Sequence, residues 1–213
     1  VGSPERPMSA DLLPSGIAQL GLDIPDAGRE RLTAYLALLE KWNKVYNLTA
    51  IRDRARMVIE HVLDSLAIAA YVRPTRVLDV GSGAGLPGIP LAIACPSWQL
   101  TLLDSNHKRC AFLQQALIEL ELHNAQVACA RVESYRPQAG FDTVVSRAFS
   151  ETQHFARMAA PLLAPEGLML AMKGLYPHEE LAQLPPGVLL RSVETLLVPG
   201  LDAQRHLVVM TNA

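Results

Sequence analysis

The sequence predicts an α/β fold: a doubly wound, mostly parallel sheet with an antiparallel C-terminal hairpin and an N-terminal helical cap. After Pro74, five short apolar runs alternate with three segments of helical length, which is typical of a parallel sheet covered on both faces. The last two apolar runs, 188–198 and 205–211, have no helical segment between them, so we expect an antiparallel pair. Before Pro74, apolar residues recur at helical spacing.

Three helices are expected in the cap, residues 9–73: one from Ser9 to Leu20, one from Pro25 onward, and one from Arg54 to Tyr71. The apolar stripe of the second helix consists of Leu32, Leu36, Leu39, Trp42 and Val45. We expect Trp42 to pack in the core. The stripe of the third helix consists of Val58, Val62, Leu66 and Ala69.

The sheet domain, residues 74–213, is expected to form one compact unit with the cap. Its first five strands are predicted at 76–81, 99–104, 126–130, 143–148 and 167–174. Its helices are predicted at 87–95, 106–122 and 151–163. Residues 1–8 are polar and interrupted by prolines, so we expect a disordered tail.

Composition excludes several classes of protein. Half of the 213 residues are hydrophobic, which excludes a mostly disordered chain. The net charge is -2, so a grip on nucleic acid must come from a local patch. No apolar stretch approaches the roughly 18 residues that span a bilayer, and no signal peptide is visible. We expect a cytoplasmic monomer that is not bound to a membrane.

The cysteines Cys95, Cys110 and Cys129 are odd in number and widely spaced. They match neither a disulfide framework nor a metal-binding knuckle. We therefore expect three small buried thiols in a reducing compartment, and no metal.

The turn after the first strand is rich in glycine. Gly81, Gly83 and Gly85 would let the backbone turn sharply and approach a ligand. Ligands of doubly wound sheets bind outside the carboxyl ends of the strands. A frame over 83–88 also satisfies GxGxxG, so a nicotinamide dinucleotide is a rival ligand. Asp79, which could hold an ammonium group, and the bulky Leu86 both argue against it.

The next strand ends add polar groups to the same edge. Asp104 could accept both ribose hydroxyls, or could cap the following helix. The pair Val132 and Glu133 could reach an adenine edge. Together with Asp79 and the glycines, they predict a pocket for an adenosine joined to an amino acid. Arg147 would bind an anionic group beside it, or form a structural salt bridge.

Six segments resemble one family, the glucose-inhibited division protein B family of ribosomal RNA small subunit methyltransferases. They are KWNKVYNLTAIRD (41–53), HVLDSL (61–66), DVGSGAGLPGIPLAI (79–93), LLDSNHKRCAFL (102–113), VVSRAF (144–149) and RHLVV (205–209). The resemblance implies a Rossmann-like class I methyltransferase sheet that uses S-adenosylmethionine and releases S-adenosylhomocysteine. It implies methylation at N7 of a guanine, position 527 of 16S rRNA, in the small ribosomal subunit or its precursor. The cofactor contacts that it implies are Gly81, Leu86, the pair Val132 and Glu133, and Arg147.

Guanine N7 carries a lone pair and no proton, so in-line displacement needs no general base. We expect no catalytic base and assign catalysis to positioning and electrostatics. Arg147 is therefore expected to bind and not to transfer a proton.

The RNA is expected to contact a local rim of polar and basic residues around the cofactor mouth. The candidates are Asn47, Arg52, Arg54, Arg56, His61, Lys108, Arg109, Arg147, Lys173, Arg205 and His206. Each could equally be an ordinary surface charge. His61 and Asp64 share one helix face, which fits either a structural pair or a substrate role.

Three other functions remain open from the residues alone. They are a nicotinamide-dependent oxidoreductase, a non-catalytic RNA-binding or assembly protein, and a methyltransferase acting on a small molecule or a protein. Cofactor titration and a transfer assay would separate them.

Overall fold

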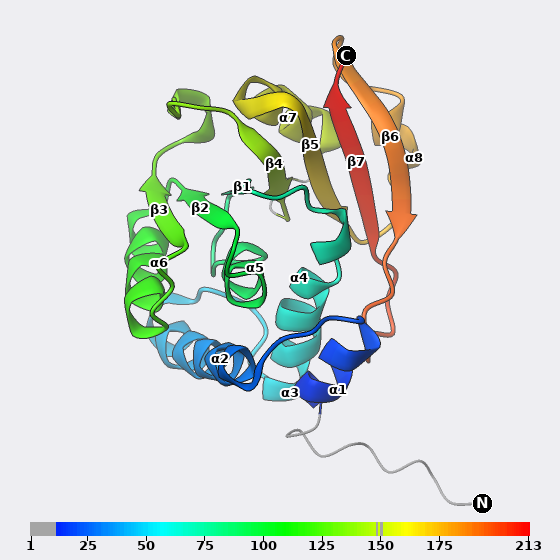
Figure 1. Ribbon diagram of the computed structural model, residues 1–213. Coiled ribbons are helices and arrows are strands. Elements are labelled where there is room, and N and C mark those ends of the chain that lie inside the picture. Colours follow the sequence, from blue (N-terminus) through cyan, green and yellow to red (C-terminus); the bar gives the residue numbers. More distant parts are fainter. Residues whose placement is uncertain (1–11, 148, 150) are drawn as a thin grey trace, which may run out of the picture.

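The computed structural model describes residues 12–147, 149 and 151–213. Within these residues one sheet has the strand order β3-β2-β1-β4-β5-β7-β6. The strands from β1 to β5 pair in parallel, whereas β7 is antiparallel to both β5 and β6. The predicted α/β fold, with its C-terminal antiparallel hairpin and N-terminal helices, is confirmed (Figure 1). The expected tail, residues 1–8, lies outside the described residues.

The strands lie close to the predicted apolar runs. They are β1 (Arg76–Val80), β2 (Gln99–Asp104), β3 (Ala125–Cys129), β4 (Phe141–Ser146), β5 (Leu163–Lys173), β6 (Val188–Thr195) and β7 (His206–Asn212). The helices are α1 (Leu12–Gln19), α2 (Asp26–Tyr46), α3 (Arg54–Met57), α4 (Asp64–Leu66), α5 (Gly88–Ala94), α6 (His107–Glu119), α7 (Thr152–Ala159) and α8 (His178–Leu181). The four-residue α8 was not predicted, because it has no apolar periodicity of helical length.

Alternating strand residues face two hydrophobic cores, one on each side of the sheet. Val77 faces the core that also contains α2, α5 and α6, whereas Leu78 faces the core that contains α7. The cap belongs to the first side: α2 packs against α5 and α6, and α4 packs against α5. Figure 1 shows α1, α2 and α3 gathered beneath the sheet on that side.

The predicted stripe of α2 is confirmed for Leu32, Leu36 and Leu39, which are buried. Trp42 packs against the same core and stacks on Tyr46. The prediction for Val45 is wrong: its side chain is 70% exposed. The whole last turn of α2, residues 44–46, is exposed, because it runs past the edge of the core that the helix covers.

The third predicted helix is shorter than expected: the continuous helical span covers 54–66, residues 67–68 form a turn, and Ala69–Tyr71 form a separate 3-10 helix. The hydrogen bonding also changes within 54–66. A π-helical segment, Val58–Leu63, separates α3 from α4. Asp53 caps the start, accepting a hydrogen bond from the amide of Arg56 at 2.8 Å. The predicted stripe of Val58, Val62, Leu66 and Ala69 is buried as expected. The π-helical segment also contains His61 and immediately precedes Asp64, both of which are buried polar residues.

The prediction of three unpaired cysteines is wrong. Cys110 of α6 and Cys129 at the end of β3 form a disulfide, with Cα atoms 5.9 Å apart, a separation within the usual range. The two residues are 19 positions apart and meet because α6 packs against β3, which spacing alone cannot reveal. Cys129 is exposed, not buried. Cys95 is free, and burial raises the pKa of its thiol to about 11.

One buried hydrogen bond fastens the cap to the turn after β1. The hydroxyl of Tyr35, a fully buried residue of α2, donates to the backbone carbonyl of Ala84 at 2.7 Å. Burial raises the pKa of Tyr35 above its ordinary value, so the phenol stays a donor. The role of Tyr35 could not be predicted from the sequence, since a tyrosine between two apolar helix positions carries no signal of its own.

We predict that Tyr35→Phe lowers the free energy of unfolding by about 1–3 kcal/mol, because the Ala84 carbonyl loses its buried partner. Urea denaturation measures this change. Tyr46→Phe is the matched control on the same helix: Tyr46 is 43% exposed, so we expect a change within about 0.5 kcal/mol. Equal unfolding midpoints for the two variants would contradict the role of this bond.

Candidate functional site

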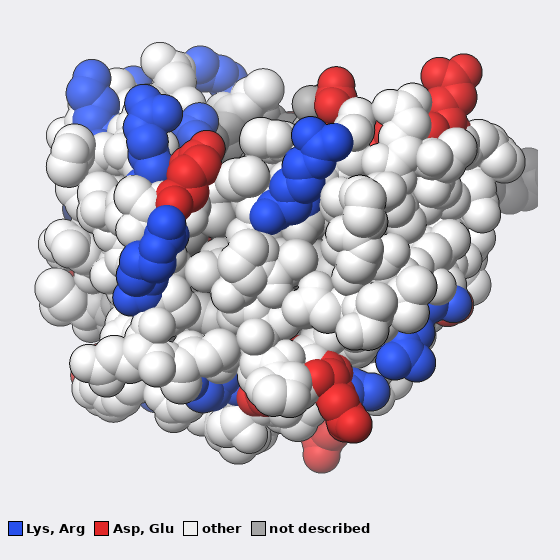
Figure 2. All heavy atoms as spheres, turned by 90° about the horizontal axis from the view of Figure 1, so that it is seen from above, with Lys and Arg blue, Asp and Glu red and all other residues white. Residues whose placement is uncertain are grey.

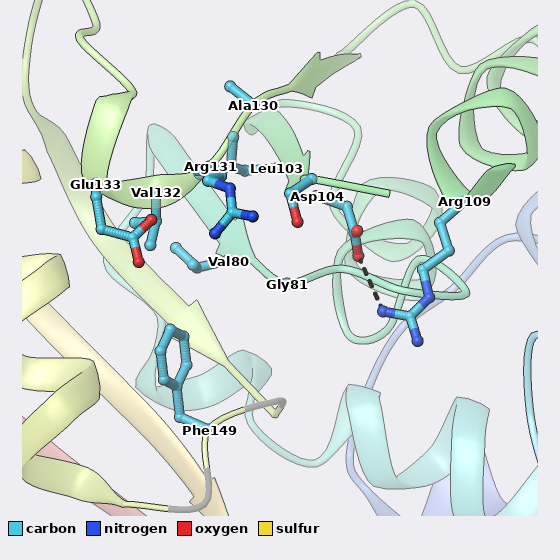
Figure 3. A pocket seen from close by; sticks show the side chains of 11 residues that line it. Val80, Gly81, Leu103, Asp104, Arg109, Ala130, Arg131, Val132, Glu133 and Phe149 are labelled. Carbon is cyan, nitrogen blue, oxygen red and sulfur yellow. Dashed lines mark ion pairs between the residues drawn. The ribbon is translucent and has the colours of Figure 1, made fainter. Parts of the chain in front are cut away.

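The strand order reverses between β1 and β4, which is where doubly wound sheets bind ligands. Two hollows lie at the carboxyl ends of the strands near this point. The first, here called the β2 crevice, has a volume of about 240 Å³ (Figure 3). It is lined by Val80, Gly81, Leu103, Asp104, Ser105, Arg109, Ala130, Arg131, Val132, Glu133 and Phe149.

The glycine turn forms the floor where β1 meets this crevice. Gly81 and Gly83 have φ angles of +72° and +57°, which glycine adopts without strain. The amide of Gly81 donates to the carbonyl of Leu103 at 2.8 Å, and the amide of Gly83 donates to Asp104 Oδ2 at 2.9 Å. The turn is therefore fixed against the end of β2, in a conformation that residues with a Cβ would resist.

Asp104 lies where the turn, β2 and α6 meet, and its carboxylate is almost fully buried. Its Oδ1 accepts from the amide of Asn106 at 2.8 Å, and its Oδ2 lies 3.6 Å from the guanidinium of Arg109 (Figure 3). The alternative prediction, that Asp104 caps α6, is wrong because Asn106 is the cap: its side chain accepts hydrogen bonds from the amides of Lys108 and Arg109. Asp104 therefore lines the crevice and orients the turn, and it does not cap α6.

Asp79 is fully buried behind the turn. Its Oδ2 accepts from the amide of Gly88 at 3.0 Å. Its Oδ1 is the side-chain atom that, among the described residues, is buried without a hydrogen-bond partner. Burial raises the pKa of this carboxyl to about 6. An unsatisfied buried oxygen of this kind is costly, and an ammonium group reached directly or through water would satisfy it.

The predicted adenine contacts, Val132 and Glu133, line the β2 crevice together. Figure 3 shows the carboxylate of Glu133 and the guanidinium of Arg131 projecting into it, with the ring of Phe149 on the opposite side. The position of Arg131 could not be predicted from the sequence, because an isolated arginine after a strand gives no signal. Four other predicted cofactor contacts do not line the crevice as it stands: Asp79, Gly83, Gly85 and Leu86. The Leu86 side chain packs in the core. The cofactor contacts of these four residues remain predictions.

The second hollow, here called the arginine pocket, has a volume of about 390 Å³. It is lined by Ile51, Glu60, His61, Asp64, Arg147, Met172, Lys173, Gly174 and Arg205. Four residues predicted as RNA contacts, His61, Arg147, Lys173 and Arg205, therefore come together here although they are far apart in the chain. Arg147 lines this pocket and not the β2 crevice, so its predicted contact with the cofactor also remains a prediction.

A buried carboxylate organises the arginine pocket. Asp64 Oδ2 lies 3.2 Å from Arg147 Nη1, and Asp64 Oδ1 accepts from Arg205 Nε at 3.0 Å. Arg147 Nη1 also donates to the backbone carbonyl of Glu60 at 2.9 Å. Asp64 thereby joins three distant segments: the cap, the residue after β4 and the residue before β7.

His61 is not paired with Asp64. Its Nε2 lies 2.8 Å from Thr49 Oγ1 and its Nδ1 lies 3.1 Å from the carbonyl of Glu60. Burial, followed by the charge of Arg147, lowers the pKa of His61 to about 4. The ring is therefore neutral at pH 7, with both nitrogens engaged inside the protein.

The remaining RNA candidates are dispersed. Asn47, Arg52, Arg56 and Lys108 are exposed, Arg54 pairs with Glu40, and His206 is buried against the carbonyl of Gly174. Arg109 lies at the β2 crevice. On the face drawn in Figure 2, Lys and Arg form separate groups, some of them beside Asp or Glu. The contacts of all these residues with RNA remain predictions.

Within the described part of the chain, no group of three or more His, Cys, Asp or Glu residues could hold a metal ion. No helix in that part is long and apolar enough to cross a membrane.

Comparison with known proteins identifies close relatives. Residues 29–208 match the GidB family, described as rRNA small subunit methyltransferase G. Two curated relatives carry the name ribosomal RNA small subunit methyltransferase G. The protein from Laribacter hongkongensis is 55% identical over 196 residues, covering 92% of this chain and 95% of that one. The protein from Nitrosospira multiformis is 52% identical over 211 residues, covering 96% and 98%.

Solved structures share the fold at low sequence identity. The O-methyltransferase NcsB1, in complex with S-adenosylmethionine and a naphthoic acid, aligns with a TM-score of 0.58 and 20% identity, covering 71% of this chain and 54% of that one. TrmN from Thermus thermophilus aligns with a TM-score of 0.53 and 21% identity, covering 70% and 47%. At this identity these likenesses show the fold alone.

We predict that affinity for S-adenosylhomocysteine rises about tenfold between pH 5 and pH 7. Asp79 has a pKa of about 6, so it is mostly neutral at pH 5 and ionised at pH 7, and the ionised form attracts the ligand ammonium. Calorimetric titration across this range measures the effect. Asp79→Asn is the control and should bind weakly with no such slope; the same slope in this variant would exclude Asp79 as its origin.

We predict that Gly81→Val abolishes binding of S-adenosylhomocysteine. A branched side chain would occupy the lining of the β2 crevice and strain a backbone with φ of +72°. Gly187→Val is the matched control: its φ is +84° and no atom lies within 4 Å of an added Cβ, so it bears similar strain outside both hollows. Normal binding by Gly81→Val would mean that the pocket has been misplaced.

Proposed function

Because the chain belongs to the rRNA small subunit methyltransferase G family, we propose that it transfers the methyl group of S-adenosylmethionine to N7 of a guanine in 16S rRNA. The target is position 527 in the usual numbering, in the small subunit or its precursor. We propose that the protein acts as a cytoplasmic monomer. The observation that carries the proposal is that both hollows lie at the reversal point of the sheet: Phe149 lines the β2 crevice, Arg147 lines the arginine pocket, and both residues follow β4.

The residues of the β2 crevice fit the cofactor. Asp104 would accept hydrogen bonds from the ribose hydroxyls. Arg109 competes for the same carboxylate only weakly, because its guanidinium lies 3.6 Å from Asp104 Oδ2. Val132 and Glu133 would lie along the adenine edge. The glycine turn leaves room for the amino-acid part, and Asp79 Oδ1, buried without a partner, offers the ammonium an acceptor. Arg147, at the end of β4, would face this part from the arginine pocket.

When bound, S-adenosylmethionine supplies an electrophilic methyl group on a positively charged sulfur. The arginine pocket would hold the guanine so that the N7 lone pair meets that methyl group in line. N7 has no proton to lose, so the chain needs no general base. His61 fits this requirement, because it is neutral and its ring nitrogens already contact Thr49 and Glu60.

Methylation at N7 makes the guanine cationic, so the surroundings must tolerate new positive charge. The arginine pocket contains two carboxylates, Asp64 and Glu60, beside its cations. The exposed Arg56 lowers the pKa of Glu60, so this carboxylate stays ionised near neutral pH. Both carboxylates pair with arginines, so the positive charge of the pocket is partly compensated and opposes the cationic product less than free cations would.

We predict that the protein transfers labelled methyl groups from S-adenosylmethionine to small subunits isolated from cells that lack it. Mapping of modified nucleotides should find 7-methylguanosine at one position of 16S rRNA. Subunits from cells that contain the protein are the control and should accept little label, because the position is already methylated. Binding of NAD(H) without binding of S-adenosylhomocysteine, or label confined to another base, would contradict the proposal.

A further inference from the structure

The arginine pocket gathers hydrogen-bond donors from three segments of the sheet domain. Arg147 follows β4, Lys173 ends β5 and Arg205 precedes β7. Arg and Lys side chains donate and cannot accept. Guanine presents two acceptors, N7 and O6, on the edge that contains the reacting nitrogen, whereas adenine presents N7 and an amino donor there. A donor-lined pocket therefore matches guanine and opposes adenine.

The two arginines differ from Lys173 in how much of them remains accessible. The side chains of Arg147 and Arg205 are 28% and 23% exposed, whereas that of Lys173 is 9% exposed and pairs with Glu180 at 2.7 Å. A guanidinium has five N–H donors. Asp64 and the Glu60 carbonyl hold Arg147 through Nη1 alone, so the rest of its fork can face a ligand.

The orientation of both arginines depends on one carboxylate. Asp64 is buried at 2% exposure and contacts Arg147 with one oxygen and Arg205 with the other. Without this charge the two guanidinium groups would repel each other and would lose their fixed directions. With it, the two cations and one anion form a compact donor array next to the carboxyl end of β4.

We propose that Asp64 is a positioning residue that aims Arg147 and Arg205 at O6 of the target guanine, and thereby makes the arginine pocket select guanine over adenine. A donor on O6 orients the base without covering the N7 lone pair, which must stay open to the methyl group. This inference rests on the proposed function and names its base-reading residues.

The experiment uses small subunits reconstituted with guanosine, inosine or 2-aminopurine riboside at the target position. Inosine keeps O6 and N7 and lacks the 2-amino group, whereas 2-aminopurine keeps N7 and the 2-amino group and lacks O6. We expect the wild-type protein to methylate guanosine and inosine at similar rates, and 2-aminopurine more slowly by about tenfold or more, the worth of one good base contact.

The decisive quantity is the ratio of the guanosine rate to the 2-aminopurine rate, compared between variants. The two bases differ in the intrinsic reactivity of N7, but this difference is the same for every variant and cancels when ratios are compared. Asp64→Asn should lower the ratio about tenfold. Arg205→Gln should also lower this ratio, and it leaves the pair of Asp64 and Arg147 in place. This second variant keeps the test valid if Asp64→Asn does not fold.

Glu40→Gln is the matched control. It removes the carboxylate that pairs with Arg54 at 2.9 Å in the same cap but outside the arginine pocket, so its ratio should equal that of the wild type. An unchanged ratio in both Asp64→Asn and Arg205→Gln would overturn the inference and leave the proposed function intact. A wild-type protein that binds S-adenosylhomocysteine but methylates no guanosine subunit would instead overturn the proposed function.

Discussion

The site depends on how the turn after β1 is held against the end of β2. Two backbone amides donate to the Leu103 carbonyl and a third donates to the Asp104 carboxylate, so the turn cannot move independently of β2. The positive φ angles at Gly81 and Gly83 aim these amides. The same carboxylate that fixes the turn also faces the β2 crevice. Ligand recognition and backbone order therefore share one group, and a change at Asp104 alters both.

The helical cap completes the site from the other direction. Tyr35 holds the turn at Ala84, and Asp64 holds Arg147 and Arg205. Both residues come from helices that precede the sheet, and both are buried, so their hydrogen bonds are shielded from water. The cap is thus more than a cover for hydrophobic surface, because it fixes polar groups on either side of the sheet's reversal point.

The mostly parallel sheet, its antiparallel C-terminal hairpin and most helix positions could be predicted, because apolar periodicity reports burial directly. The polar groups at strand ends, such as Asp104 and Glu133, could also be placed at one edge by the rule for parallel strands. What periodicity could not show was which distant residues meet. The disulfide of Cys110 with Cys129, the Tyr35 bond and the pairing of Asp64 with two arginines all join positions that only tertiary packing brings together.

A protein with a net charge of -2 can still bind a polyanion, because its cations are present and are paired with carboxylates. In the arginine pocket, Arg147 and Arg205 share Asp64, and Lys173 pairs with Glu180. Compensation lowers the long-range attraction for phosphate, yet the outer N–H groups of each cation can still donate at short range. Such a pocket discriminates by hydrogen-bond geometry more than by charge, which suits a base that is neutral before the reaction and cationic after it.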